Sequence, residues 1–106
     1  LVSAAGSTNA TSVKTSAGRL YTVHGYNAAA ATRYVKLYDK TSAPTVGTDT
    51  PRKTIAVPAS TAFALDWHNG LAFAAGIGFA LTTGAADNDT GAVTAGDILG
   101  LNLDYI

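Results

Sequence analysis

Short segments in which apolar and polar residues alternate recur along the chain, separated by turn-forming residues. Alternation with a period of two is the pattern of a half-buried β-strand. No window of about 11 residues keeps apolar positions at helical spacing without an interruption by Gly, Pro or clustered Thr. The pattern predicts eight strands, over residues 8–14, 19–27, 33–39, 53–57, 62–67, 71–74, 76–82 and 98–105.

The last segment has the most regular pattern. Every second residue from Leu99 to Tyr105 is apolar or aromatic, and the residues between them are Gly, Asn and Asp. One buried and one wetter face are therefore expected for this strand. Taking the inward position of each strand gives a predicted core of Val13, Tyr21, Val23, Val35, Leu37, Ile55, Val57, Phe63, Leu65, Leu71, Phe73, Ile77, Phe79, Leu81, Leu99, Leu101 and Leu103.

Eight short strands with turn signals between them predict an all-β fold. The expected architecture is a two-layer antiparallel β-sandwich, jelly-roll-like, of about eight strands, forming a single domain over residues 1–106. Residues 1–10 are a candidate extended arm. Two long loops, 40–52 and 84–96, are expected to be functional or interfacial, because loops of this length are uncommon in compact domains.

The chain is poor in charge. Only 13% of its residues are charged, against about 25% in typical soluble domains. One explanation is that much of the surface is covered in an assembly, since the cores of protein interfaces are depleted in charge. The other is a surface rich in Thr and Ser that needs no covering. The first is favoured, and it predicts a homo-oligomer, with a trimer as the first guess.

The charge balance and the residue inventory exclude several partners. Seven Lys and Arg residues balance seven Asp, so no basic nucleic-acid footprint is present. No apolar run approaches the roughly 18 residues that cross a bilayer, so no membrane partner is expected. The chain contains no Cys, which excludes disulfides and thiolate metal sites.

Catalytic residues are not apparent, and the chain is predicted not to be an enzyme. Asp66, beside Trp67 and His68, is the only carboxylate flanked by an aromatic ring and an imidazole. It could be an acid or base beside a sugar-stacking ring, but the Asn69-Gly70 pair favours a turn. No serine lies in a nucleophile elbow, and no phosphate loop is present.

No metal or cofactor is expected either. His24 and His68 have no partner at ligand spacing, and a transition-metal site needs at least three ligands. Asp87 and Asp89 resemble the start of a calcium loop, but its glycine and terminal Glu are missing.

Tyrosines in the third predicted strand are the best interface candidates. Tyr34, Lys36 and Tyr38 lie opposite Val35 and Leu37. They could anchor an interface, because tyrosine supplies contact area at little entropic cost, or they could pack on the second face of their own sheet. The predicted interface set is Tyr34, Lys36, Tyr38, Pro44, Trp67 and His68.

Several segments together resemble a family of small structural proteins encoded by tailed bacteriophages. They are RYVKLYDK from Arg33, APTVGTDTP from Ala43, GLAF from Gly70 and AGDILGLN from Ala95, and the likeness runs from Asn9 to Tyr105. The resemblance implies a virion component of β-sandwich type, either on the capsid exterior, as a decoration (cement) protein, or at a tail or head fibre tip. The first is favoured: a non-enzymatic decoration protein that oligomerises, contacts the major capsid protein and stabilises the shell.

A rival interpretation is a receptor-binding or carbohydrate-binding module of a phage fibre or tail. In that case Trp67, Tyr26 or Tyr21 would form an exposed platform for sugar rings. Such a module should show at least two coplanar exposed rings beside a polar cleft, whereas a decoration protein should have no concave groove.

Overall fold

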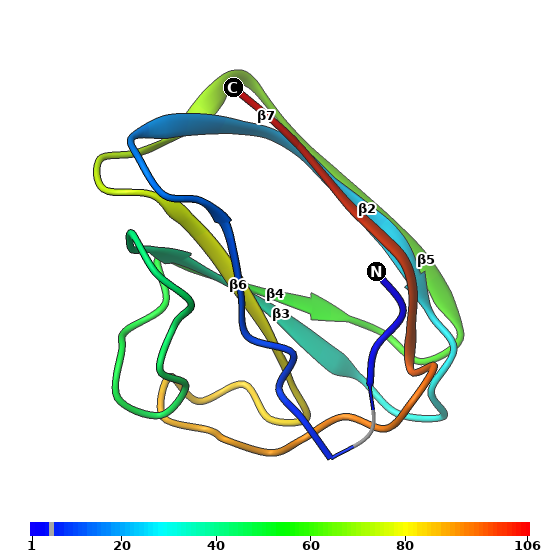
Figure 1. The fold of residues 1–106 in the computed structure, drawn as a ribbon. Helices are drawn as coiled ribbons and strands as arrows, with labels where there is room; N and C mark the ends of the chain where they lie inside the picture. The colour runs from blue at the N-terminus through cyan, green and yellow to red at the C-terminus, as the bar shows by residue number, and fades with distance from the viewer. Residues whose placement is uncertain (5) are drawn as a thin grey trace.

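The computed structural model of the chain describes residues 1–4 and 6–106, and every regular element in them is a β-strand. In the described residues no helix is long and apolar enough to cross a membrane. The predicted all-β class is confirmed (Figure 1). The strands are β1 (Thr11–Lys14), β2 (Gly18–Asn27), β3 (Arg33–Asp39), β4 (Lys53–Val57), β5 (Thr61–Phe73), β6 (Ile77–Thr82) and β7 (Ile98–Tyr105).

The strands form two antiparallel sheets. One has four strands in the order β1-β6-β3-β4, and the other has three in the order β5-β2-β7. Only β3 and β4 are both consecutive in the chain and paired with each other, so every other connection passes from one sheet to the other. The chain is thereby threaded repeatedly between two layers, as the predicted β-sandwich requires.

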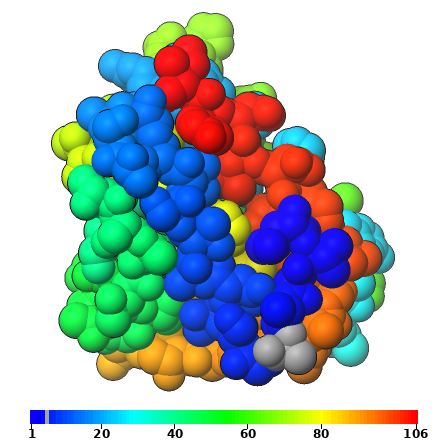
Figure 2. All heavy atoms as spheres, viewed as in Figure 1, coloured from blue at the N-terminus to red at the C-terminus, as the bar shows by residue number. Residues whose placement is uncertain are grey.

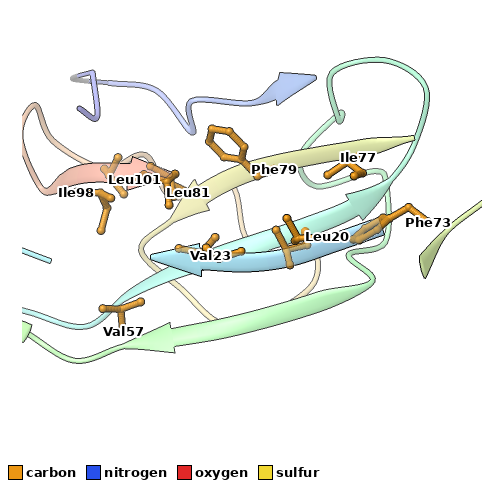
Figure 3. Packing of buried hydrophobic residues seen from close by; sticks show 12 residues of the cluster. Leu20, Val23, Val57, Phe73, Ile77, Phe79, Leu81, Ile98 and Leu101 are labelled. Atoms are coloured by element: carbon orange, nitrogen blue, oxygen red, sulfur yellow. The ribbon is translucent and has the colours of Figure 1, made fainter. Parts of the chain in front are cut away.

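One hydrophobic core lies between the sheets (Figure 3). Leu20 and Val23 of β2 approach it from the three-stranded sheet, and Val35 and Leu37 of β3 approach it from the other. Fully burying one such side chain contributes about 1.5–3 kcal/mol relative to leaving it exposed. The buried cluster is Leu20, Val23, Val35, Leu37, Val57, Phe73, Ile77, Phe79, Leu81, Val93, Ile98 and Leu101.

A bulge of four residues lies between two predicted strands, which form one continuous strand in the structure. The chain therefore has seven strands instead of eight. Leu20 pairs with Leu71 and Thr22 with Asp66, so residues 67–70 of β5 lie opposite Tyr21 alone. Gly70 allows the bulge because its φ is +79°, a backbone conformation that residues with a Cβ rarely adopt. The bulge also shifts the alternation of β2, so that Leu20 and Val23 point inward and Tyr21 is only half-buried.

A second bulge changes the face of Leu99. Between His24 and Tyr26 the pairing of β2 with β7 shifts, and Gly100 has φ of +60°. Ile98 is therefore buried in the core, whereas Leu99 is 37% exposed. The prediction that Leu99 shares the inward face is wrong, and Leu65 on edge strand β5 is also more exposed than predicted, at 39%.

The first residues lie against the domain instead of extending from it. The backbone of Leu1 exchanges two hydrogen bonds with Leu101, and Ser3 N–H donates to the Ile98 carbonyl. Ser7 forms an antiparallel bridge with Val93. Figure 2 shows the start of the chain, in dark blue, packed beside β7 in orange and red. For the described part of residues 1–10, the extended-arm prediction is wrong.

Candidate functional site

Three of the six predicted interface residues are covered by the protein's own loops. Lys36 is 0% exposed, Tyr38 is 1% exposed and Pro44 is buried. Lys36 and Tyr38 do lie opposite the core residues Val35 and Leu37, as predicted. The expectation that they present themselves to another chain is wrong, because loops 40–52 and 83–92 fold over this outer face of the four-stranded sheet.

The contacts of the two loops explain this cover. Pro44 lies over Gly78 of β6, where an added Cβ would come 3.2 Å from the Pro44 Cδ. Gly78 is the register partner of Tyr38, so Pro44 lies on the face of the sheet to which Tyr38 points. The loops also touch each other, since a Cβ on Gly47 would come 2.7 Å from the Cγ2 of Thr90. The four-stranded sheet is therefore packed on both faces.

Lys36 of β3 holds loop 83–92 against the sheet. Its Nζ donates to the carbonyl oxygens of Ala86, at 2.5 Å, and Asp89, at 3.5 Å. Burial lowers the pKa of Lys36, and the carboxylates of Asp89 and Asp87 act in the opposite direction. An ammonium bound to loop carbonyls holds a loop in place, so Lys36 has a structural role in this chain.

Replacing Lys36 with Met should loosen this loop while preserving the sheet beneath it. Methionine keeps an unbranched buried stem but removes the charge-assisted bonds to the loop carbonyls. We expect amide hydrogen exchange at Thr83 and Asp89 to become about tenfold faster, because their hydrogen bonds to the Gly91 and Ala86 carbonyls lie in the loop that Lys36 holds in place. Exchange in β3 should stay unchanged. Equal acceleration in β3 would show instead that the substitution destabilises the whole domain.

A shallow cleft of about 270 Å³ lies at the end of β3, lined by Tyr38, Asp39, Lys40, Asp49 and Thr50. Its charged groups already have partners. The Lys40 Nζ donates to the Asp49 carboxylate at 2.6 Å. The Asp39 carboxylate accepts three backbone N–H groups, from Ala74, Ala75 and Gly76. These bonds support the local fold and leave no charged group of the cleft unpaired.

The sequence Asp66-Trp67-His68 does not form an exposed aromatic site. Trp67 is half-buried and packs against the core, whereas His68 is exposed in the bulge of β5. Asp66 is exposed on β5 and pairs with Thr22 across the sheet. Within residues 1–4 and 6–106, no three His, Cys, Asp or Glu side chains gather at a spacing that could hold a metal ion. Of the predicted interface set, Tyr34 is half-buried and only His68 is exposed.

The outer face of the three-stranded sheet is largely exposed. Its residues fall into three rows across β5, β2 and β7, as the strand registers give them. We call this surface the open face. Its rows are Ala62, Tyr26 and Leu99; Ala64, His24 and Asn102; and Asp66, Thr22 and Asp104.

The open face is apolar at one end and acidic at the other. Tyr26, 39% exposed, lies beside Leu99 and Ala62 in the apolar row. In the acidic row the Thr22 hydroxyl donates to the Asp104 carboxylate, and Asp66 lies on the other side of Thr22. Arg19, the only Lys or Arg of these three strands, donates to the carbonyl oxygens of Asn69 and Gly70 in the bulge.

Sequence reasoning missed this surface because it depends on a bulge. Strict alternation through residues 98–105 places Leu99 inward, and only the shift at Gly100 turns it outward beside Tyr26. The signal was a glycine between two leucines, which often marks a bulge in a strand. The sequence offers Tyr26 only as part of the candidate sugar platform.

No family model matches the chain, and neither does any curated protein or solved structure.

Proposed function

We propose that the chain is a non-enzymatic structural protein of a virion: a decoration protein on the capsid exterior that oligomerises and stabilises the shell. The observation that carries the proposal is the unequal covering of the two sheets. The four-stranded sheet is covered outside by loops 40–52 and 83–92, whereas the open face of the other sheet has no such cover in the described residues.

The chemistry of the open face suits contact with another protein. Its apolar row exposes an aromatic and an aliphatic side chain, Tyr26 and Leu99, and tyrosine is enriched in protein interfaces. Its rows follow three neighbouring strands, so the exposed side chains lie side by side across one sheet face. The location on a capsid is part of the proposal, and it rests on the resemblance of the sequence to tailed-phage structural proteins.

The carbohydrate-binding alternative has less support. Two coplanar exposed rings beside a polar cleft were its expected mark, but Trp67 packs against the core and Tyr21 is half-buried in the bulge. Tyr26 is the one tyrosine or tryptophan in the rows of the open face. The cleft at the end of β3 has Tyr38 as its single ring, and that residue is buried.

Particles that lack this protein should assemble but should rupture more readily. A decoration protein stabilises a shell through many weak, repeated contacts, so its loss lowers resistance to heat and osmotic shock without preventing assembly. The experiment deletes the gene and measures genome release during heating and after rapid dilution from high salt.

Adding the purified protein back should restore the resistance of the depleted particles, which controls for damage during preparation. Depleted particles as robust as the wild type, yet unable to adsorb to cells, would contradict a stabilising role and favour the receptor-binding alternative.

A further inference from the structure

We propose that the open face binds a protein surface that presents a Lys or Arg side chain next to an apolar side chain, repeated many times in one lattice. This inference rests on the proposed function and adds which surface of the chain is used and what the partner must present. It follows from the charge, the apolar row and the area of the open face.

The acidic row selects a cation. Asp66 and Asp104 are both exposed and lie on the two sides of Thr22. With strands about 4.8 Å apart, their Cα atoms are separated by about 10 Å, so one basic side chain reaching over Thr22 would meet both carboxylates. The ion pairs formed by the described residues are Arg33–Asp97 and Lys40–Asp49. Arg19 therefore forms no ion pair with the acidic row.

The apolar row selects an apolar side chain of the partner, which would pack between Tyr26 and Leu99. These two are register partners on adjacent strands and are both more than one-third exposed. Tyrosine is enriched among the residues that contribute most to binding. Because the apolar row and the acidic row lie at opposite ends of the face, the partner must present its two groups in one orientation.

The area of the open face argues for a repeated partner. Three strands about 4.8 Å apart and three rows about 6.8 Å apart cover roughly 300 Å² including their margins. A stable interface needs about 800 Å² from each partner. A second copy of this chain would offer only another face of the same size and the same acidic sign. A lattice that holds several linked copies at once can retain the protein despite the small area of each contact.

The test measures binding to shells purified from particles propagated without the gene. Purified wild-type protein and the variants Tyr26→Ala and Asp66→Lys with Asp104→Lys are added, and the bound fraction is measured by co-sedimentation. Both variants should bind about tenfold more weakly than the wild type. Binding of the wild type should weaken as ionic strength rises, and binding of Asp66→Asn with Asp104→Asn should change less.

Asp87→Lys is the matched control, because Asp87 is exposed on loop 83–92 and outside the open face. It makes the charge change of one of the two open-face Asp→Lys substitutions and should retain wild-type binding. Circular dichroism and thermal unfolding establish that each variant is folded. As a readout that needs no variant, carbodiimide coupling of carboxylates to lysines should join Asp66 or Asp104 to the shell protein, as identified by mass spectrometry.

The outcomes distinguish a failure of the decoration role from a failure of the open face as its binding surface. Shells that fail to bind the wild-type protein would overturn the proposed function and this inference with it. Shells that bind the wild type and both open-face variants equally well, or that are coupled only through Asp49, Asp87 or Asp89, would overturn the inference alone and leave the decoration role standing.

Discussion

Replacing Tyr38 with Ala should lower the free energy of unfolding by about 3–5 kcal/mol, the cost of emptying the space of a large buried aromatic residue. The ring is 1% exposed and lies between the four-stranded sheet and the loop that contains Pro44. If Tyr38 instead lay at an interface with another chain, the same substitution would weaken assembly and leave the isolated fold intact. Urea unfolding of the purified protein at low concentration distinguishes the two.

Tyr38→Phe is the matched variant, and it should have the opposite sign. The Tyr38 hydroxyl is buried and has no hydrogen-bond partner among the described residues. Burial raises the pKa of this hydroxyl, with Asp49 and Asp87 adding to the rise, so it stays neutral. Removing a buried, unbonded hydroxyl relieves a desolvation cost of about 1 kcal/mol. A clear loss of stability in Tyr38→Phe would show that the hydroxyl is bonded in solution.

Asp97→Ala should have the second-largest effect, a loss of about 3 kcal/mol, because it leaves a largely buried Arg33 without its partner. Asp97 immediately precedes β7 and is 7% exposed. Its carboxylate accepts from the Arg33 Nε at 2.8 Å and from the N–H and hydroxyl of Thr94 at 3.0 and 2.6 Å. This one side chain joins the start of β3 to the loop that leads into β7. Thermal or urea unfolding measures the loss.

Asp49→Ala is the control for this prediction. The Lys40–Asp49 pair is as short, at 2.6 Å, but its side chains are 32% and 28% exposed, compared with 17% and 9% for Arg33 and Asp97. Ion pairs open to solvent contribute little to stability, so Asp49→Ala should change unfolding only slightly. Equal losses in the two variants would contradict the importance given to burial.

The same carboxylate should make the fold sensitive to acid. Burial alone would raise the pKa of Asp97, but hydrogen bonds from Thr94 and Arg33 outweigh it and lower the pKa below its ordinary value. The folded state therefore binds this proton less readily than the unfolded state. The resulting stabilisation is present above the unfolded-state pKa of about 4 and is lost as pH falls through the folded value. Asp97→Asn should flatten this part of the curve of stability against pH.

The positions of most strands could be predicted because their alternation survives in the structure. Residues 33–39 and 53–57 were predicted with the bounds that β3 and β4 have. Alternation also placed Val35 and Leu37 on the inward side correctly. These segments contain no irregularity, so a period of two is sufficient to describe them.

The faces next to bulges could not be predicted from periodicity. Leu20 and Ile98 were left out of the predicted core, and both are 0% exposed because a bulge near each of them reverses the alternation. A bulge inserts residues in one strand and not in its partner, so it depends on a pairing that a single sequence does not contain.

The predicted interface depended on an ambiguity that periodicity also leaves open. Alternation showed that Lys36 and Tyr38 turn away from the core, but an outward side chain can be covered by another chain or by a loop of its own chain. Here loops 40–52 and 83–92 provide the cover. Which of the two occurs is decided by loop conformation, and loops rich in Gly, Pro, Thr and Asp have no period from which it could be read.

The pairing of Leu1 and Ser3 with β7 protects one sheet edge from strand addition by other copies of the chain. Fibres that grow by strand addition need a free edge on both sides of the same sheet. The backbone bonds of Leu1 to Leu101 and of Ser3 to Ile98 occupy the first half of one such edge in the three-stranded sheet, and another chain would have to displace them. The start of the chain thereby disfavours open-ended filaments that grow by strand addition at this edge.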